Sequence, residues 1–199
     1  MATDRLVMAT DGDLILVCEG RELQVSSHKL SAASPVFCAM FGPHFSEGHA
    51  LRNATEGSLI TVSLPDDSFM TIEALCHAIH HAKIGDLDSR GYRTEEEAVL
   101  AFALLVDKYQ CVEATEKAVT GYFKELIRPC GVAQIALLIR ATYLLDHAQY
   151  FQEYTDLFMH FNFCWDTRKE TMVADGVFYD ISENVHGWSL HDKMVVNSD

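Results

Sequence analysis

Short apolar runs separated by turn residues occupy the first third of the chain, a pattern typical of β-strands. Residues 14–18 (LILVC) are aliphatic and partly β-branched, and residues 21–25 (RELQV) alternate between polar and apolar side chains. Glu19-Gly20 lies between them as a hairpin turn signal, so we predict that these two strands pair as neighbours. A third strand is predicted over residues 59–64 (LITVSL).

Two short helices are predicted between the second and third of these strands. Ser26 and Ser27 are good N-caps for the first helix, and Ser34-Pro35 ends it and begins the second, because proline suits the first turn of a helix. The second helix ends at residues 42–43 (GP), and a polar loop follows. The expected buried face of the second helix consists of Val36, Phe37, Met40 and Phe41.

From Ser68 onward the apolar residues follow the helical period, with Asp67 or Ser68 as the first cap and a capping box from Thr94 to Glu97. Strands in the first third and helices in the rest make the fold class α+β. No sustained period follows residue 166, so this tail is poorly predicted. Helices are expected over about 69–79, 94–106, 112–127, 132–145 and 150–161. The last of them carries a stripe that we expect to pack as core: Tyr150, Phe151, Tyr154, Leu157, Phe158 and Phe161.

Charge and composition narrow the classes of partner. The chain has 199 residues, 49% of them hydrophobic, and 15 basic against 29 acidic residues give a net charge of −14. Because like charges repel, this balance opposes contact with phosphate backbones or anionic lipid. We therefore expect protein partners, with neither nucleic acid nor membrane among them.

The sequence also bears on the compartment. The first residues, MATDRLVMATDGD, contain no apolar segment of a secretory signal, and the longest apolar run, 98–106, is far shorter than the ~20 residues of a membrane span. The six cysteines occur singly, and most stand in apolar company, where we expect them to be buried. The expected location is intracellular, in the cytoplasm or nucleus.

The sequence shows no nucleotide-binding fingerprint, no GxSxG elbow and no HExxH motif. One constellation has metal-ligand character: on a helix, His77 and His81 share a face, as do Cys76 and His80. A closed zinc site needs two further ligands, and no paired Cys or His motif elsewhere supplies them. We therefore predict no metal, no cofactor and no catalytic residue; a metal-dependent enzyme is the remaining enzyme alternative.

Four segments, in order and spacing, resemble a BTB/POZ domain, and most of all its fungal branch: GDLILVC (12–18), VSSHKLSAASPVFCAMF (25–41), CHAIHHA (76–82) and LVDKYQCVEA (105–114). The stretch from Arg140 to Phe158 is similar to the helical extension that often follows fungal members. The resemblance implies a BTB/POZ domain over 11–126, a helical extension over 127–165, and a poorly predicted tail over 166–199.

The resemblance implies a small three-stranded sheet flanked by a helical cluster, and a non-catalytic protein–protein interaction module. BTB domains self-associate, dock transcriptional co-regulators, or hold substrates for a ubiquitin ligase built on the BTB-specific cullin. The leading interpretation is an adaptor that docks to such a cullin. The alternative is a scaffold or transcription-associated partner-binding protein with no ligase role.

The candidate partner-binding residues are Phe45, Ser46 and Glu47. They resemble the hydrophobic-x-Glu trio that contacts the cullin in ligase-adaptor members of the family. An exposed Phe45 suits an apolar notch, and Glu47 can set the register through a charge or hydrogen bond. In the other interpretation, Phe45 packs back on the core and Glu47 is merely solvated.

The chain departs from animal members of the family in two ways. One concerns the charged pocket at the dimer groove of those members, and the other concerns their strand-exchanged dimer. Asp13 matches the family's pocket aspartate, but counting back from the SPVF motif places Ser26 and Ser27 where animal members have His and a basic residue. His28-Lys29 is out of register, so Asp13 lacks its basic partner. Only twelve residues precede Asp13, too few for the helix and strand of the strand-exchanged dimer, so a monomer, or a dimer through another surface, is expected.

Overall fold

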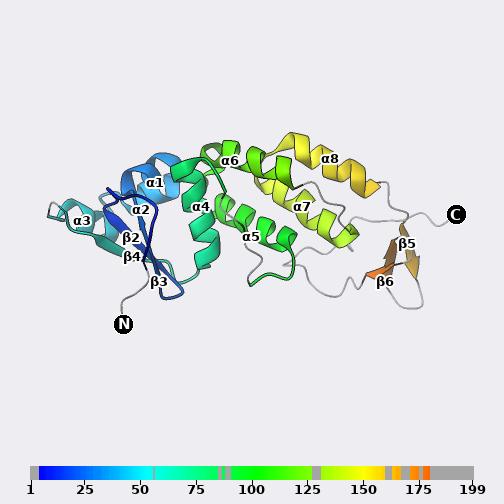
Figure 1. The fold of residues 1–199 in the computed structure, drawn as a ribbon, viewed down its shortest axis with the longest axis horizontal. Helices are drawn as coiled ribbons and strands as arrows, with labels where there is room; N and C mark the ends of the chain where they lie inside the picture. Colours follow the sequence, from blue (N-terminus) through cyan, green and yellow to red (C-terminus); the bar gives the residue numbers. More distant parts are fainter. Residues whose placement is uncertain are drawn as a thin grey trace.

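The computed structural model describes residues 5–55, 57–84, 87, 91–126 and 131–159, and the backbone of 163–166, 171–174 and 177–179. A four-stranded sheet lies with three short helices at one end of the molecule, and long helices extend from it (Figure 1). The sheet order is β1-β3-β2-β4, with β2 antiparallel to β3 and parallel to β4. Its strands are β1 (Arg5–Val7), β2 (Leu14–Cys18), β3 (Arg21–Val25) and β4 (Ile60–Ser63).

The prediction of a three-stranded sheet was one strand short. β1 pairs in parallel with β3 of the same chain, with Arg5 opposite Glu22. The Arg5 Nε atom donates to Glu22 Oε2 at 2.9 Å. Three residues are too few to show a period of two, and this strand depends on partners distant in the sequence. The α+β class itself is confirmed.

The two short helices are confirmed as α1 (Ser27–Ala33) and α2 (Pro35–Met40). The Ser26 side chain accepts from the Lys29 N–H, and the Ser34 side chain accepts from the Phe37 N–H, as expected of N-caps. Phe37 is fully buried, whereas Val36, Met40 and Phe41 are partly buried against the same core.

A third short helix, α3 (Ser46–Arg52), lies where a polar loop was predicted. Its N-cap is Phe45, whose side chain cannot accept a hydrogen bond, and Gly48 lies inside it. Both residues are poor helix signals, so the sequence pattern conceals the helix.

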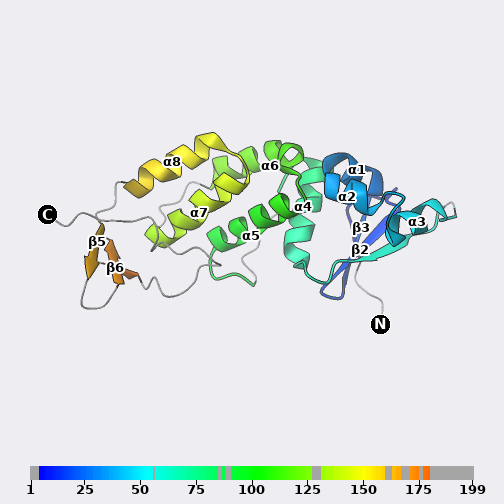
Figure 2. The same ribbon diagram turned by 180° about the vertical axis from the view of Figure 1, so that it is seen from behind.

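Five long helices follow, each close to its predicted range. α4 packs against the sheet side of the molecule and against α5 and α6, while α5, α7 and α8 lie side by side in succession (Figures 1 and 2). None of the helices in the described residues is long and apolar enough to cross a membrane. The helices are α4 (Phe69–His81), α5 (Glu95–Lys108), α6 (Val112–Glu125), α7 (Val132–Leu144) and α8 (Ala148–Met159).

The cap of α4 differs from the prediction. Ser68 occupies the N-cap position, but its side chain makes no capping hydrogen bond. The Phe69 N–H instead donates to Glu19 Oε2 at 3.1 Å, from the turn between β2 and β3. The carboxylate of Asp67 is engaged elsewhere, as described below.

The aromatic stripe of α8 packs as predicted for Tyr150, Tyr154 and Phe158, which are buried. The Tyr150 ring stacks on Phe123 of α6 with centroids 5.1 Å apart. Phe151 and Leu157 lie at the margins of the stripe and are exposed, and Phe161 lies outside the described residues.

An antiparallel three-stranded sheet follows α8, where the sequence pattern indicated no strands. Its order is β5-β6-β7. The strands are β5 (Phe163–Asp166), β6 (Thr171–Ala174) and β7 (Val177–Tyr179).

A buried carboxylate joins three parts of the fold. Asp67, between β4 and α4, accepts from Lys108 Nζ through Oδ1 and from the Tyr109 hydroxyl through Oδ2, both at 2.6 Å. The Tyr109 ring stacks on Phe37 with centroids 4.3 Å apart, and its backbone carbonyl accepts from the Ser34 hydroxyl at 2.5 Å. Burial, and then the bond to Asp67, raise the pKa of Tyr109.

We expect Tyr109→Phe to lower the free energy of unfolding by about 1.5–3 kcal/mol, because it keeps the stacked ring but removes a hydrogen bond to a buried carboxylate. The matched control is Tyr143→Phe, since the Tyr143 side chain is 72% exposed. The control should change stability by less than about 0.5 kcal/mol in urea unfolding. Equal losses in the two variants would contradict this role of the Tyr109 hydroxyl.

Candidate partner-binding surface

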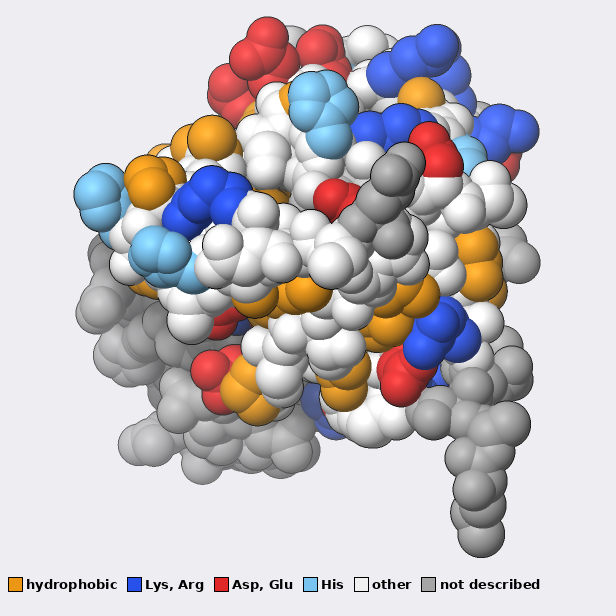
Figure 3. Space-filling view, turned by 90° about the vertical axis from the view of Figure 1, so that its left-hand side faces the viewer, with side chains coloured by type: hydrophobic (Ala, Val, Ile, Leu, Met, Phe, Trp, Pro, Cys, Tyr) orange, Lys and Arg blue, Asp and Glu red, His pale blue; other side chains and the backbone are white. Residues whose placement is uncertain are grey.

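α3 presents the predicted trio at the end of the molecule that faces the viewer in Figure 3. The Phe45 side chain is 51% exposed, while its backbone carbonyl accepts from the His49 N–H at 3.1 Å. The ring therefore points out to solvent rather than back into the core. Apolar, histidine, basic and acidic side chains are all present on this face (Figure 3).

Ser46 and Glu47 form the first turn of α3. The Ser46 hydroxyl donates to Glu47 Oε2 at 2.9 Å, and the Glu47 side chain is half-buried. A carboxylate in a first helical turn is favoured by the unpaired N–H groups there. The structure thus places an exposed aromatic ring and a held carboxylate on one turn.

Gly48 fixes where that turn lies. A methyl group at this position would overlap the carbonyl oxygens of Gly42 and Phe41, so α3 approaches the end of α2 as closely as backbone allows. Gly48 is buried within a short helix. Sequence reasoning missed it, although a glycine inside a helix is itself a signal of close approach.

The second predicted pair is also brought together. The Ser27 N–H donates to Asp13 Oδ1 at 2.8 Å, and the Ser27 hydroxyl donates to Asp13 Oδ2 at 2.6 Å. Both carboxylate oxygens of Asp13 are thereby engaged at the start of α1. His28 and Lys29 are exposed on the same helix. A hydroxyl and an amide of Ser27 thus bind the Asp13 carboxylate.

The buried thiols are poorly suited to nucleophilic chemistry. Burial raises the pKa of Cys18 to about 11 and that of Cys111 to about 12, and it raises the pKa of Cys76 further. Thiols that stay protonated at neutral pH are weak nucleophiles. Cys38 is exposed, contrary to the expectation of burial, because it lies on the outer side of α2.

The histidines of α4 form a row without a metal-binding arrangement. The rings of His77 and His81 have centroids 5.5 Å apart, as their spacing predicts. Within the ranges that the structure describes, no three His, Cys, Asp or Glu side chains converge as metal ligands. Both ring nitrogens of His80 lie within hydrogen-bond distance of backbone groups.

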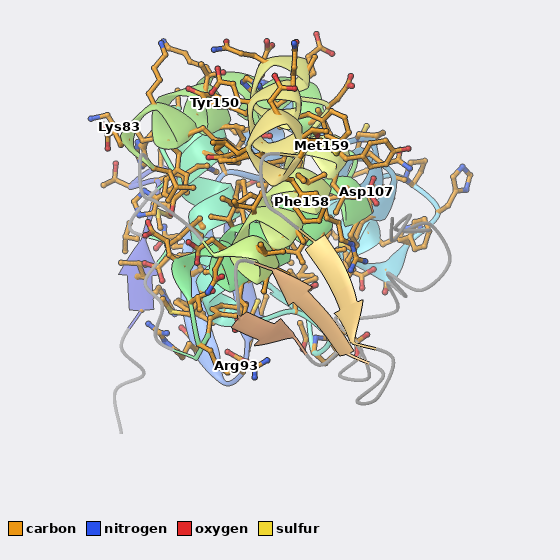
Figure 4. The ribbon with its side chains drawn as sticks, turned by 90° about the vertical axis from the view of Figure 1, so that its right-hand side faces the viewer. Lys83, Arg93, Asp107, Tyr150, Phe158 and Met159 are labelled. Atoms are coloured by element: carbon orange, nitrogen blue, oxygen red, sulfur yellow. The ribbon has the colours of Figure 1, made fainter. Side chains whose placement is uncertain are left out.

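A second apolar surface lies on α7 and α8. Tyr143 is 72% exposed and its ring lies 6.2 Å from that of Phe151. Met159, at the end of α8, is exposed, whereas Tyr150 and Phe158 on the same helix are buried (Figure 4). The sequence analysis expected the whole stripe of α8 to pack as core, and this was wrong for Phe151 and Leu157, which are exposed.

The fold and this surface define a small α+β domain that presents apolar and charged side chains on a short helix at one end. The BTB/POZ domain family profile matches residues 9–126, more than half of the chain. The chain belongs to the BTB/POZ domain family, whose members are protein-interaction modules and generally not enzymes. The match is to the family as a whole, so the fungal branch stays a prediction.

Among solved structures, the chain is similar to the BTB (Tramtrack and Bric a brac) domain of human gigaxonin. The sequence identity is 19% and the TM-score is 0.38, over 55% of this chain and 76% of that one. A search of curated proteins found no match.

We expect Gly48→Ala to destabilise the protein and displace α3, since the added methyl group meets backbone rather than a flexible side chain. Gly121→Ala is the matched control, because nothing lies within 4 Å of the corresponding Cβ position in α6. The control should stabilise the protein by up to about 1 kcal/mol, as alanine replaces glycine in a helix. Thermal unfolding measures both variants, and a stabilising Gly48→Ala would refute the close approach.

Proposed function

We propose that this protein is an interaction adaptor that docks to a BTB-specific cullin through Phe45 and Glu47 on α3. One observation carries the proposal: a half-exposed Phe45 ring and the Glu47 carboxylate share a turn that Gly48 holds in place. Membership of the BTB/POZ family supports an interaction role, and the hydrophobic-x-Glu resemblance supports the choice of a cullin.

The energetics favour Phe45 as the anchor of such a contact. Half of a phenylalanine side chain corresponds to roughly 100 Å² of apolar surface, and covering it contributes about 2.5 kcal/mol. Glu47 adds little affinity of its own in solvent, but it selects a partner with a donor at the right distance. The aromatic ring thus supplies binding strength and the carboxylate supplies register.

The residues of α3 do not share the strongly negative charge of the whole chain. Although the chain carries −14, Glu47 is the only acidic residue in α3, against Arg52 and the nearby His44 and His49. All three of these side chains are exposed. Within α3 itself, Glu47 and Arg52 balance, so the helix adds no net repulsion toward an acidic partner.

The second candidate is a scaffold or transcription-associated binder with no ligase role, located inside the cell. The exposed side chains of Tyr143, Phe151, Leu157 and Met159 on α7 and α8 favour it, since they form a surface separate from α3. Affinity purification separates the two functions: ubiquitin-ligase subunits among the bound proteins support the first, and their absence supports the second.

We expect Phe45→Ala to weaken binding to the N-terminal domain of the cullin by roughly 10- to 100-fold, and Glu47→Arg by at least as much. Phe45 is exposed and Glu47 is half-buried, so circular dichroism of each variant is needed to check that the fold is retained. The matched controls are Val7→Ala, with 48% exposure, and Glu113→Arg, in the first turn of α6. Titration calorimetry showing wild-type affinity in both α3 variants would rule out this contact.

We also propose a monomer in solution, because β1 is already paired with β3 of its own chain. Multi-angle light scattering should then give a mass near 22.3 kDa. A concentration-independent mass of twice that value would contradict the proposal.

A further inference from the structure

His80, at the end of α4, has both ring nitrogens engaged by backbone groups. Nδ1 lies 3.0 Å from the Cys76 carbonyl oxygen, and Nε2 lies 3.2 Å from the Ser26 nitrogen. A carbonyl only accepts and a backbone N–H only donates, so Nδ1 must carry the proton and Nε2 must be the acceptor. This arrangement requires a neutral ring in one tautomer.

The bond to Ser26 joins two helices that are distant in the sequence. Ser26 is the N-cap of α1, and Ser27 next to it binds Asp13. α1 has only seven residues, and its first turn contains no acidic residue. An isolated helix of that length is unstable, so contacts at its start have a large effect on its position.

Lys29 on α1, His81 on α4 and Asp11 in the loop before β2 act electrostatically on the His80 ring. Burial, followed by Lys29 and His81, lowers the pKa of His80 from its ordinary 6.5, and the Cys76 carbonyl and Asp11 oppose this only in part. At neutral pH the ring is therefore uncharged and able to accept.

We propose that His80 is a protonation-sensitive latch that holds the start of α1 against the end of α4 and releases it when the ring becomes charged. An imidazolium carries a hydrogen on both nitrogens, so it cannot accept from the Ser26 N–H. The two N–H groups then face each other, and Asp11 becomes the nearby anion that favours the charged ring. Release frees the start of α1 beside the Asp13–Ser27 pair.

The direction of the pH dependence follows from the lowered pKa of His80. The unfolded chain binds a proton on this histidine more readily than the folded protein, so acid favours unfolding. The contribution of His80 to stability is complete above its ordinary pKa of 6.5 and is lost as the pH falls through the lower folded value. His77 also has a lowered pKa, through burial and His81, but among the described residues no backbone N–H donates to its ring.

The test compares His80→Gln with the matched control His77→Gln at about pH 7.5 and about pH 5. A glutamine amide oxygen can accept from the Ser26 N–H without titrating. Amide hydrogen exchange at the start of α1, corrected for intrinsic rates, should rise roughly three- to tenfold at the lower pH in the wild-type protein and in His77→Gln. His80→Gln should show no such rise.

An equal rise of the exchange rate at the lower pH in His80→Gln would overturn the proposal. So would the absence of that rise in His77→Gln. A second measurement on the wild-type protein needs no variant to fold: nitrogen-15 spectra of the His80 ring at neutral pH. They should show a proton on Nδ1 and none on Nε2. A ring protonated on Nε2 at neutral pH would also overturn the latch.

Discussion

The carboxylate of Asp67 joins the sheet, the first helices and the long helices, because its two oxygens bind Lys108 and Tyr109 from the end of α5. A buried carboxylate without partners costs several kcal/mol, so these bonds fix where α5 ends. Tyr109 also contacts the two short helices: its ring stacks on Phe37, and its backbone carbonyl accepts from the Ser34 hydroxyl. The α1–α2 junction, and α3 beyond it, are positioned from this point.

The groups with raised pKa values and the exposed apolar side chains lie in different parts of the fold. Burial raises the pKa values of Cys18, Cys111 and Tyr109, and Asp67 raises those of Cys18 and Tyr109 further. Exposed apolar side chains lie on β1 and α5, at the start of α3, and in greatest number on α7 and α8. Unreactive buried thiols together with exposed apolar side chains are typical of a protein that acts by binding other proteins.

Patterns confined to neighbouring residues predicted most elements correctly. The β2–β3 hairpin and the caps at Ser26 and Ser34 depend on a few adjacent side chains, and these were found. β1 was missed because its partner Glu22 is 17 positions away, and α3 was missed because Phe45 cannot accept a capping bond and Gly48 is a poor helix former. In the candidate site, Phe45 and Glu47 could be chosen by resemblance, but the exposure of the ring required the structure. The contact between His80 and Ser26 spans 54 positions, and no local pattern encodes it.

The contact of Gly48 with the end of α2 has a consequence for the kinetics of association. Since backbone already meets backbone there, α3 has no free space in which to shift toward α2 when a partner arrives. In the proposed complex, this close approach limits the conformational entropy lost on binding, because the turn is fixed before the partner arrives. Differences in affinity among partners of this surface should accordingly appear in how long each complex lasts, while encounter rates stay similar.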